Sequence, residues 1–259
     1  MAIINCTTDS FYAPSRALLD EAVEKAIRAE EDGASIVDFG GESSRPGSAY
    51  VSEAEEMERV IPVVAAFRKR SSLPVSVDTR KAAVAKAALE AGADIINDIS
   101  ALYDDPLMPE LCARYGAAVV LMHKKGVPLT MQEEPFYEDV AAEVGSFLKA
   151  AAERAAAAGI CPGKIIVDPG IGFGKRLQDN LRLIGGLAEI CGKDYPVLVG
   201  LSRKRFIGEI TGRAESERLW GTLAANAAAV SGGAAIIRVH DVAEHRDMVK
   251  ILFALRSKK

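Results

Sequence analysis

The chain has 259 residues, of which 49% are apolar and 26% are charged, and its net charge is −4. This mixture is typical of a globular protein with a substantial core, and it excludes a disordered chain and a small disulfide-stapled scaffold. Neither half is strongly basic, which argues against a nucleic-acid surface. The sequence lacks an apolar run of about 18 residues and a secretory signal pattern, so we expect a cytoplasmic protein without membrane spans.

Short apolar runs rich in β-branched residues recur along the chain, separated by longer stretches of helical composition. In chain order, we expect strands at residues 2–6, 35–39, 74–78, 94–98, 117–122, 164–168, 196–200 and 234–239. The intervening stretches predict helices at residues 18–32, 53–69, 81–91, 137–158 and 215–231. This alternation indicates one β–α unit repeated eight times.

The strand runs are continuously apolar, as expected of parallel strands that are buried on both faces. Parallel strands need crossovers, and the helical stretches supply them. Four runs follow a glycine that fits the end of a helix before a tight turn: Gly33, Gly92, Gly116 and Gly233. Eight units in about 250 residues predict an α/β fold, a (β/α)8 TIM barrel, with residues 1–259 as a single domain. An open, doubly wound sheet is the alternative.

Polar residues stand at or near the ends of the expected strands. They are Asn5, Thr7, Asp38, Asp78, Asn97, Asp98, His123, Asp168, Ser202, Arg238 and His240. Because the carboxyl ends of barrel strands gather on one face, we expect these side chains to form a binding site there. Any single Asp or Asn could instead cap the helix that follows it.

Asp78, Asn97 and Asp168 are the strongest candidates, because buried carboxylates need a cation or hydrogen-bond donors as partners. Together they suit a ligand that presents several N–H donors. The edge of a 2-amino-4-oxo pyrimidine is one such ligand, since its ring N–H and its exocyclic amine match the two oxygens of a carboxylate.

The segment 170–175, Gly-Ile-Gly-Phe-Gly-Lys, has the glycines of a nucleotide-binding loop but not its pattern. Pro169 and Arg176 occupy positions where a P-loop needs Gly and Ser or Thr, and the glycine spacing differs from the dinucleotide fingerprint. A tight turn that requires positive φ angles is one interpretation. We favour the other, in which the turn lets backbone and the Phe173 ring approach a flat ligand.

Two cationic motifs follow the last two strands. Residues 202–205, Ser-Arg-Lys-Arg, open a helical stretch, where positive side chains oppose the helix dipole and suggest attraction of an anion. Arg238 and His240 lie two residues apart, on the same side of a strand. Together these groups could hold a pyrophosphate or a carboxylate. The alternatives are a solvated basic run and an ordinary histidine, and Lys204 could also form a Schiff base.

The ordered motifs of the chain resemble those of the dihydropteroate synthase family. They lie at residues 5–11, 40–47, 76–79, 96–98, 121–123, 168–175, 202–208 and 238–242. The resemblance implies a barrel that joins 6-hydroxymethyl-7,8-dihydropterin pyrophosphate to 4-aminobenzoate and releases dihydropteroate and pyrophosphate. It also implies Mg²⁺ as cofactor and a homodimer.

The family's motifs, matched residue by residue, imply a role for each candidate. The pterin would contact Asp78, Asn97, Met122, Asp168, Phe173, Lys204 and Arg238. The pyrophosphate would contact Asn5, Ser44, Arg238 and His240, with Asn5 also meeting the metal. The 4-aminobenzoate would contact Ser44, Arg45, Pro46, Phe173 and Lys204. The implied catalytic residues are Lys204, Arg238, His240 and Asp78.

The first loop departs from the family pattern. Thr8 stands where the family usually has Pro, and Ser44 in the second loop replaces Thr. The family continues Ser-Asp-Gly-Gly after the Phe, whereas residues 12–16 read Tyr-Ala-Pro-Ser-Arg and put Ala13 at the aspartate position. The residues that could replace this aspartate are Asp9, Ser15 and Arg16. Without a replacement, we expect reduced activity.

Three alternative functions stay open at this point. A related pterin-binding barrel transfers a methyl group from methyltetrahydrofolate to a corrinoid, but it would not need residues 202–204 or 44–46. The altered first loop also allows a non-catalytic pterin-binding protein. A lysine-based aldolase would use Lys204 as its Schiff base.

Overall fold

Strands and helices alternate along the chain, as the sequence predicts. A computed structural model describes residues 1–6, 16–43, 48, 50–126, 135–190 and 194–256. The strands are β1 (Ala2–Asn5), β2 (Val37–Gly40), β3 (Val75–Asp78), β4 (Ile95–Asp98), β5 (Ala118–Met122), β6 (Ile165–Asp168), β7 (Leu198–Gly200) and β8 (Ile236–Arg238). The α-helices are α1 (Arg16–Glu31), α2 (Glu53–Arg68), α3 (Ala82–Glu90), α4 (Met108–Tyr115), α5 (Val140–Ala157), α6 (Leu177–Gly185), α7 (Leu187–Ile190), α8 (Arg205–Thr211), α9 (Leu219–Ser231) and α10 (Val242–Arg256). Two short 3-10 helices are η1 (Pro162–Lys164) and η2 (Glu215–Glu217).

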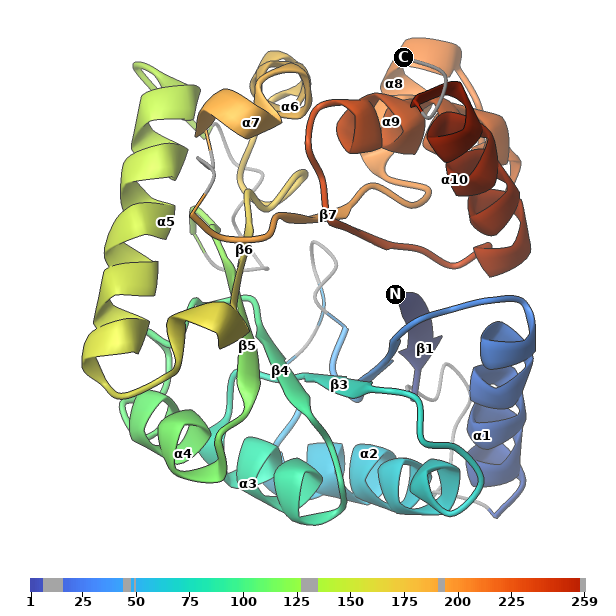
Figure 1. The fold of residues 1–259 in the computed structure, drawn as a ribbon, viewed down its shortest axis with the longest axis vertical. Helices are drawn as coiled ribbons and strands as arrows, with labels where there is room; N and C mark the ends of the chain where they lie inside the picture. Colours follow the sequence, from blue (N-terminus) through green and yellow to red (C-terminus); the bar gives the residue numbers. More distant parts are fainter. Residues whose placement is uncertain (7–15, 44–47, 49, 127–134, 191–193, 257–259) are drawn as a thin grey trace.

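The strands form a closed, parallel (β/α)8 barrel, which confirms the predicted fold class over the open sheet. Strands β1 to β6 pair in sequence order, and β7 pairs with β8. Single bridges join the two sheets, from Ala2 to Val239 on one side and from Val167 to Val197 on the other. The backbone N–H of Ile3 donates to the Val239 carbonyl at 2.9 Å, so β8 meets β1. The helices surround the strands (Figure 1).

The glycines that precede four strands have the conformation expected of helix ends. Gly33, Gly92, Gly116 and Gly233 all have positive φ angles. At Gly116, with φ 61°, the chain ends α4 in the left-handed region and turns directly into β5. A side chain would strain the backbone there. The glycine before each of these four runs therefore marks the end of a helix and the approach of a strand.

The barrel interior changes from apolar to polar along the strands. Its apolar layer consists of Ile95, Val120, Ile166 and Leu198, with Met1, Ile36, Ala118 and Ile236 packed against it. Because side chains alternate along a strand, the residue two positions further on also faces inward. On β4, β6 and β8, these positions are held by Asn97, Asp168 and Arg238. The carboxyl end of the barrel is therefore lined with polar groups above an apolar floor.

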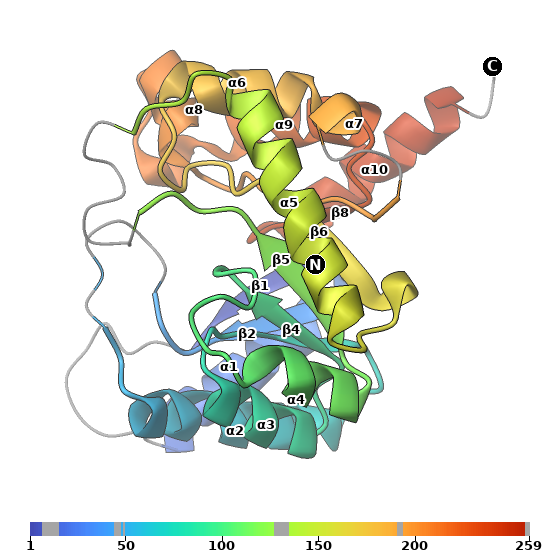
Figure 2. The same cartoon turned by 90° about the vertical axis from the view of Figure 1, so that its left-hand side faces the viewer.

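Outward-facing strand residues pack against the helices in three further apolar clusters. In the first, Phe39 of β2 meets Phe67 of α2 edge to face, with ring centroids 5.7 Å apart. Figure 2 shows α2, α3 and α4 beneath the strands and α6, α8 and α9 above them. In the part of the chain that the structure describes, every helix is too short or too polar to cross a membrane.

Candidate active site

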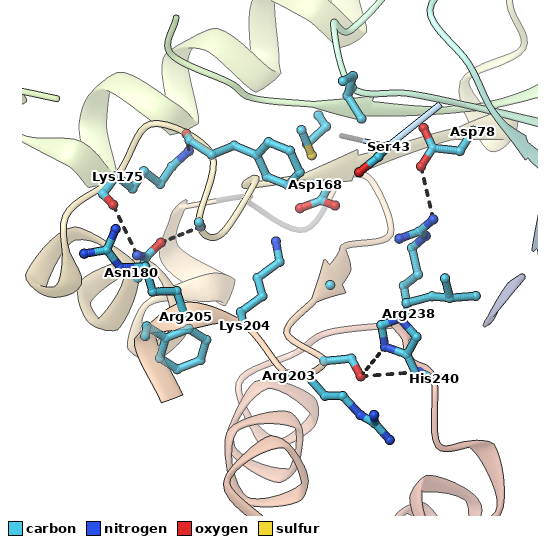
Figure 3. Close-up of a pocket in the computed structure, with 18 of the residues that line it drawn as sticks. Ser43, Asp78, Asp168, Lys175, Asn180, Arg203, Lys204, Arg205, Arg238 and His240 are labelled. Atoms are coloured by element: carbon cyan, nitrogen blue, oxygen red, sulfur yellow. Dashed lines mark hydrogen bonds and ion pairs between the residues drawn. The ribbon is translucent and has the colours of Figure 1, made fainter. Parts of the chain in front are cut away.

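A cavity of about 600 Å³ opens at the carboxyl ends of the strands. The described residues to which the family motifs assign a role all line it: Asn5, Asp78, Asn97, Met122, Asp168, Phe173, Lys204, Arg238 and His240. Figure 3 labels Asp78, Asp168, Lys204, Arg238 and His240 among them. Three other candidates, Ser44, Arg45 and Pro46, lie outside the described residues, as do residues 7–15 of the first loop. Position at a strand end therefore located the cavity correctly.

The centre of the site is an ion-paired triad that links β8 to β2 and β3. The Arg238 guanidinium donates from Nε to Asp38 at 2.6 Å and from an Nη to Asp78 at 3.1 Å. Burial raises the pKa of Asp78 to about 7, although Arg238 acts in the opposite direction and Asp38 adds to the rise. Asp78 is thus a carboxyl group that can take up or release a proton near neutral pH.

Asp38 is the member of this triad that the sequence placed in the polar ring without a specific ligand. Its side chain is fully buried, and it also accepts a hydrogen bond from the Asn97 amide at 3.3 Å. A signal for it exists, because Asp38 stands between Val37 and Phe39, which face the helices, so strand alternation turns it inward. Its partner Arg238 is 200 positions away and could not be read from the sequence.

Asp168 provides another buried carboxylate in the cavity. Its Oδ1 accepts a hydrogen bond from the Gly170 backbone N–H at 2.7 Å. Burial raises its pKa, and the nearby Lys204 ammonium opposes that rise. With Asn97 and Asp78, it presents oxygen acceptors that suit a ligand rich in N–H donors.

Lys204 and Phe173 form the wall that faces these acceptors. The Lys204 ammonium lies 4.5 Å from the centre of the Phe173 ring and donates to the Ile171 carbonyl. Burial lowers the pKa of Lys204 to about 8, while Asp168 acts to raise it. The aromatic face and the cation together suit a planar, negatively charged group.

The three cations of the basic run 202–205 have different partners. Arg203 makes a two-pronged ion pair with Asp241, from an Nη at 2.6 Å and from Nε at 3.2 Å. The Arg205 Nε instead donates to Glu209 at 2.7 Å on the same helix. Arg203, Lys204 and Arg205 all line the cavity, but the two arginines are paired with carboxylates, whereas Lys204 lies over the Phe173 ring.

His240 meets Ser202 at the cationic end of the cavity. Its Nδ1 lies 2.9 Å from the Ser202 hydroxyl oxygen, which also accepts the His240 backbone N–H at 3.3 Å. Arg238 and His240 both line the cavity, as expected of residues two apart on a strand. This corner brings together a guanidinium, an imidazole and a hydroxyl, which suits an anion.

Two residues of the expected ring face away from the cavity. Asp98 accepts the Ser100 and Leu102 backbone N–H groups, at 2.7 and 3.0 Å, so it caps the turn after β4. His123 packs edge to face on Phe147, with ring centroids 4.9 Å apart. Each of the two follows an inward-facing residue, so strand alternation directs it toward the helices.

The glycine turn 170–174 satisfies both interpretations of its sequence. Gly170, Gly172 and Gly174 have φ angles of 65°, 84° and 62°. A Cβ at Gly170 would lie 1.9 Å from the His123 carbonyl oxygen, so only glycine fits there. The same turn brings Phe173 to the cavity wall. It is therefore a tight turn that requires glycine and also a wall of the site.

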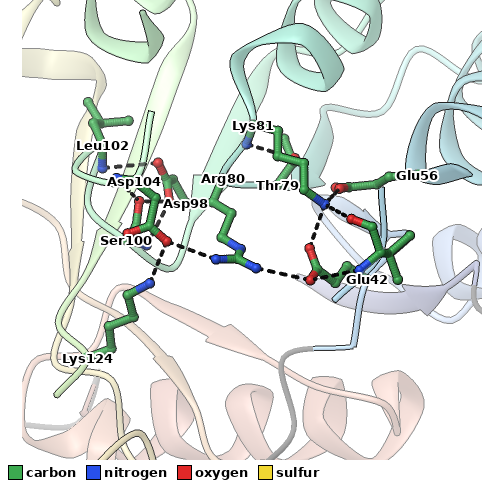
Figure 4. A network of polar contacts seen from close by, with 11 residues as sticks. Glu42, Glu56, Thr79, Arg80, Lys81, Asp98, Ser100, Leu102, Asp104 and Lys124 are labelled. Atoms are coloured by element: carbon green, nitrogen blue, oxygen red, sulfur yellow. Dashed lines mark hydrogen bonds and ion pairs between the residues drawn. The ribbon is translucent and has the colours of Figure 1, made fainter. Parts of the chain in front are cut away.

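A second ionic network supports the rim of the cavity on β2 to β5 (Figure 4). Glu42 pairs with Lys81 at 2.7 Å and with Arg80 at 3.1 Å. Arg80 also pairs with Asp104 at 3.1 Å, and Asp104 pairs with Lys124 at 2.7 Å. The four loops after these strands are thereby connected, so the rim is held without any ligand.

Comparison with known proteins places the chain in a family. The family model described as "Pterin binding enzyme" matches residues 1–240. A dihydropteroate synthase of Escherichia coli (strain K12) is 46% identical over 261 residues, spanning 100% of this chain and 92% of its own.

Solved structures agree with these sequence matches. A dihydropteroate synthase of Yersinia pestis in complex with a sulfonamide drug superposes with a TM-score of 0.93, at 43% identity, covering 99% of this chain and 93% of its own. The Xanthomonas albilineans enzyme with 4-aminobenzoic acid gives a TM-score of 0.91 at 42% identity, covering 98% and 92%.

Proposed function

The chain belongs to the pterin-binding enzyme family and has dihydropteroate synthase activity. We propose that an acidic side of its cavity binds the pterin and that a cationic side binds the leaving pyrophosphate. The enzyme is a transferase that joins 6-hydroxymethyl-7,8-dihydropterin pyrophosphate to 4-aminobenzoate, giving dihydropteroate and pyrophosphate. Relatives that bear the synthase name favour this function over a corrinoid methyltransferase, a non-catalytic binder or an aldolase.

The acidic side is proposed to hold the pterin. Asp78 and Asp168 would accept its N–H groups, and Asn97 can both donate and accept. Met122 and Phe173 would cover the flat ring with apolar surface. The observation that supports this assignment best is the pair of buried carboxyl groups in one cavity, both with raised pKa values that a ligand's N–H donors would lower again.

The cationic side is proposed to bind the pyrophosphate and its developing charge. The C–O bond to the pyrophosphate breaks with its electron pair on oxygen, the lone pair of the arylamine forms the C–N bond, and the amine then loses one proton. The electron-rich dihydropterin can bear positive charge while the bond breaks. Arg238 and His240 would stabilise the leaving group, and Ser44 would join them if the family's motif applies.

The aminobenzoate is proposed to lie between Phe173 and Lys204. The ring of Phe173 offers a stacking surface, and the Lys204 ammonium offers a counter-ion for the carboxylate. The family's motif adds Arg45 and Pro46. A weakly basic arylamine needs positioning more than it needs a base.

Magnesium is proposed as a cofactor that is shared with the pyrophosphate. Among the described residues, no group of three or more His, Cys, Asp or Glu is arranged to hold a metal ion. Asn5 offers an amide oxygen at the cavity, and Mg²⁺ is commonly bound by one or two protein oxygens together with substrate phosphates and water. The residues therefore fit such an ion, which would neutralise charge on the leaving pyrophosphate when bound.

A homodimer is proposed through exposed apolar side chains on α8, α9 and α10. They are Ile210, Trp220, Ile251 and Leu255, and Trp220 is 78% exposed. Large exposed apolar patches commonly mark protein interfaces. Sedimentation of Ile251→Asp beside wild type tests this proposal: monomer at concentrations that keep wild type dimeric is the expected result. We also propose a cytoplasmic location, which the free thiols of the described residues Cys6, Cys112 and Cys161 support.

The function is tested by pyrophosphate release from the dihydropterin substrate with Mg²⁺, with and without 4-aminobenzoate. We expect release that depends on 4-aminobenzoate, with dihydropteroate as the second product. Binding of the pterin without either product would contradict the synthase function. It would also direct attention to Ala13 in the altered first loop.

A further inference from the structure

Lys175 is a buried cation with no part in the reaction as described above. Its side chain is 3% exposed, although it directly follows the glycine turn 170–174. Its Nζ donates to the carbonyls of Gly170 at 2.9 Å and Phe173 at 3.1 Å. We propose that Lys175 is a positioning residue that fixes this turn in the arrangement that binds both substrates. The inference rests on the proposed roles of Asp168, Phe173 and Lys204.

The turn is a shared support for those three side chains. The Gly170 backbone N–H donates to Asp168 at 2.7 Å, and the Ile171 carbonyl accepts from Lys204. Phe173 belongs to the turn itself. A displacement of the turn backbone would therefore move an acceptor on one wall of the cavity together with the aromatic ring and the cation on the other.

Lys175 also fastens the turn to the end of β5. Its Nζ lies 3.0 Å from Nδ1 of His123 and 3.4 Å from the His123 carbonyl oxygen. Burial lowers the pKa of His123 to about 3, so the ring is neutral and its Nδ1 can accept the lysine proton. The Lys175 Nζ thus contacts both ends of the turn and the residue that follows β5.

Other side chains hold the outer edge of the turn. The Gly172 backbone N–H donates to Asn180 at 2.7 Å (Figure 3). The Tyr137 hydroxyl donates to the Gly174 carbonyl at 2.7 Å. Lys175 donates to the Gly170 and Phe173 carbonyls, the first of which also accepts the Phe173 backbone N–H at 3.1 Å. Burial lowers the pKa of Lys175 to about 7, because burying an ammonium is costly. Four protein acceptors surround its Nζ and make its placement specific: Nδ1 and the carbonyl of His123, and the carbonyls of Gly170 and Phe173.

Loss of Lys175 has a distinct kinetic consequence. A turn with three positive-φ glycines has wide conformational freedom once its carbonyls lose their donor. If the competent conformation falls to about a tenth of the population, apparent affinity falls by about tenfold, while turnover at saturation is unchanged. A side chain that contacts the reacting groups would lower kcat instead.

The test compares Lys175→Met, which keeps the length without N–H donors, with Lys164→Met. Lys164 also donates to a backbone carbonyl, that of Gly116, but at the amino end of β6. For Lys175→Met we expect KM for both substrates to rise about tenfold with kcat within about threefold, and hydrogen exchange of a peptide covering 169–176 to accelerate about tenfold. Lys164→Met should match wild type in both measurements.

Two outcomes would overturn the inference. One is unchanged exchange in the 169–176 peptide, and the other is faster exchange with unchanged KM values. Tyr137→Phe, which removes one bond to the same turn, gives a milder variant in case Lys175→Met does not fold, and it should change KM and exchange in the same direction. Failure of the proposed function is separately visible, because wild type would then form no dihydropteroate while the exchange comparison still reports on the turn.

Discussion

The two sides of the barrel differ in charge and in how they are built. Strands β1 to β6 form a continuous sheet that supplies the acceptors Asp38, Asp78 and Asp168, whereas the pair β7 and β8 is followed by or contains the cations Lys204 and Arg238. Single bridges join the two sheets, and ion pairs cross the cavity between them. The substrate has the matching polarity, with N–H donors on the pterin and negative charge on the pyrophosphate. The boundary between the two sheets thus also separates the acceptors of the site from its cations.

Replacement of Arg238 by Ala should have the largest effect on this arrangement, because it removes the central cation of the β8 side. We expect kcat/KM to fall by about 10²–10³, as for the loss of a preorganised charge in other active sites. Steady-state kinetics with both substrates measures this. Arg70→Ala, which removes a surface pair with Glu24, is the matched control. Unchanged kinetics in Arg238→Ala would remove the residue from the site.

Asp38→Asn tests the same link from the acidic side. It keeps the size of the side chain but takes away the charge that faces the Arg238 guanidinium. Breaking a buried ion pair by removing one partner costs about 3 kcal/mol, so we expect the free energy of unfolding to fall by about that amount. Urea denaturation followed by circular dichroism measures it. A loss below about 0.5 kcal/mol would mean that the two sides are not coupled through this pair.

The protonation of Asp78 should make pterin binding on the acidic side depend on pH. Its folded-state pKa of about 7 lies above the ordinary value of 3.8, so the free site holds a proton in slightly acidic solution. N–H donors on the ligand favour the ionised form, so binding releases that proton. Affinity for a pterin should therefore rise by about tenfold per pH unit up to about pH 7 and then level off. Calorimetric titration measures this, and Asp78→Asn should bind weakly with no such dependence.

The sequence predicted the barrel well because its signals are local. Glycines such as Gly92 mark the strand starts, and the apolar runs mark the strands to within a few residues. Strand ends located the cavity residues as well. The position of a strand end does not tell which face of the sheet a side chain lies on. Asp98 and His123 each follow an inward-facing residue, so they face the helices rather than the cavity.

Long-range partners explain the remaining differences. Asp38 acquires its role from Arg238, which reaches it only because β8 closes the barrel against β1. The ion pair of Arg203 depends on Asp241, which lies 38 positions further on. The sequence assigns no separate role to Lys175, because its contact with His123 depends on how β5 and β6 pair. Such partners follow from closure of the fold rather than from local pattern.

Loss of the ion pair between Arg203 and Asp241 should have the smallest effect on kcat/KM. Arg203 has a φ of 56°, unusual for a side-chain-bearing residue, and it stands between Ser202, which contacts His240, and Lys204, which faces Phe173. Its ion pair with Asp241 is partly exposed, and such a pair contributes about 1 kcal/mol at most. Asp241→Asn should therefore lower kcat/KM by no more than about fivefold.

Glu217→Gln is the matched control, since it weakens an exposed pair with Arg213. A fall of about 10² in Asp241→Asn would show that Arg203 itself bears on the substrate. In that case, the β7 side would contribute a second cation to the anion site, and its basic run would need to be assigned again. A small effect, with kcat/KM of Glu217→Gln unchanged, would leave Lys204 as the cation that this loop directs into the cavity.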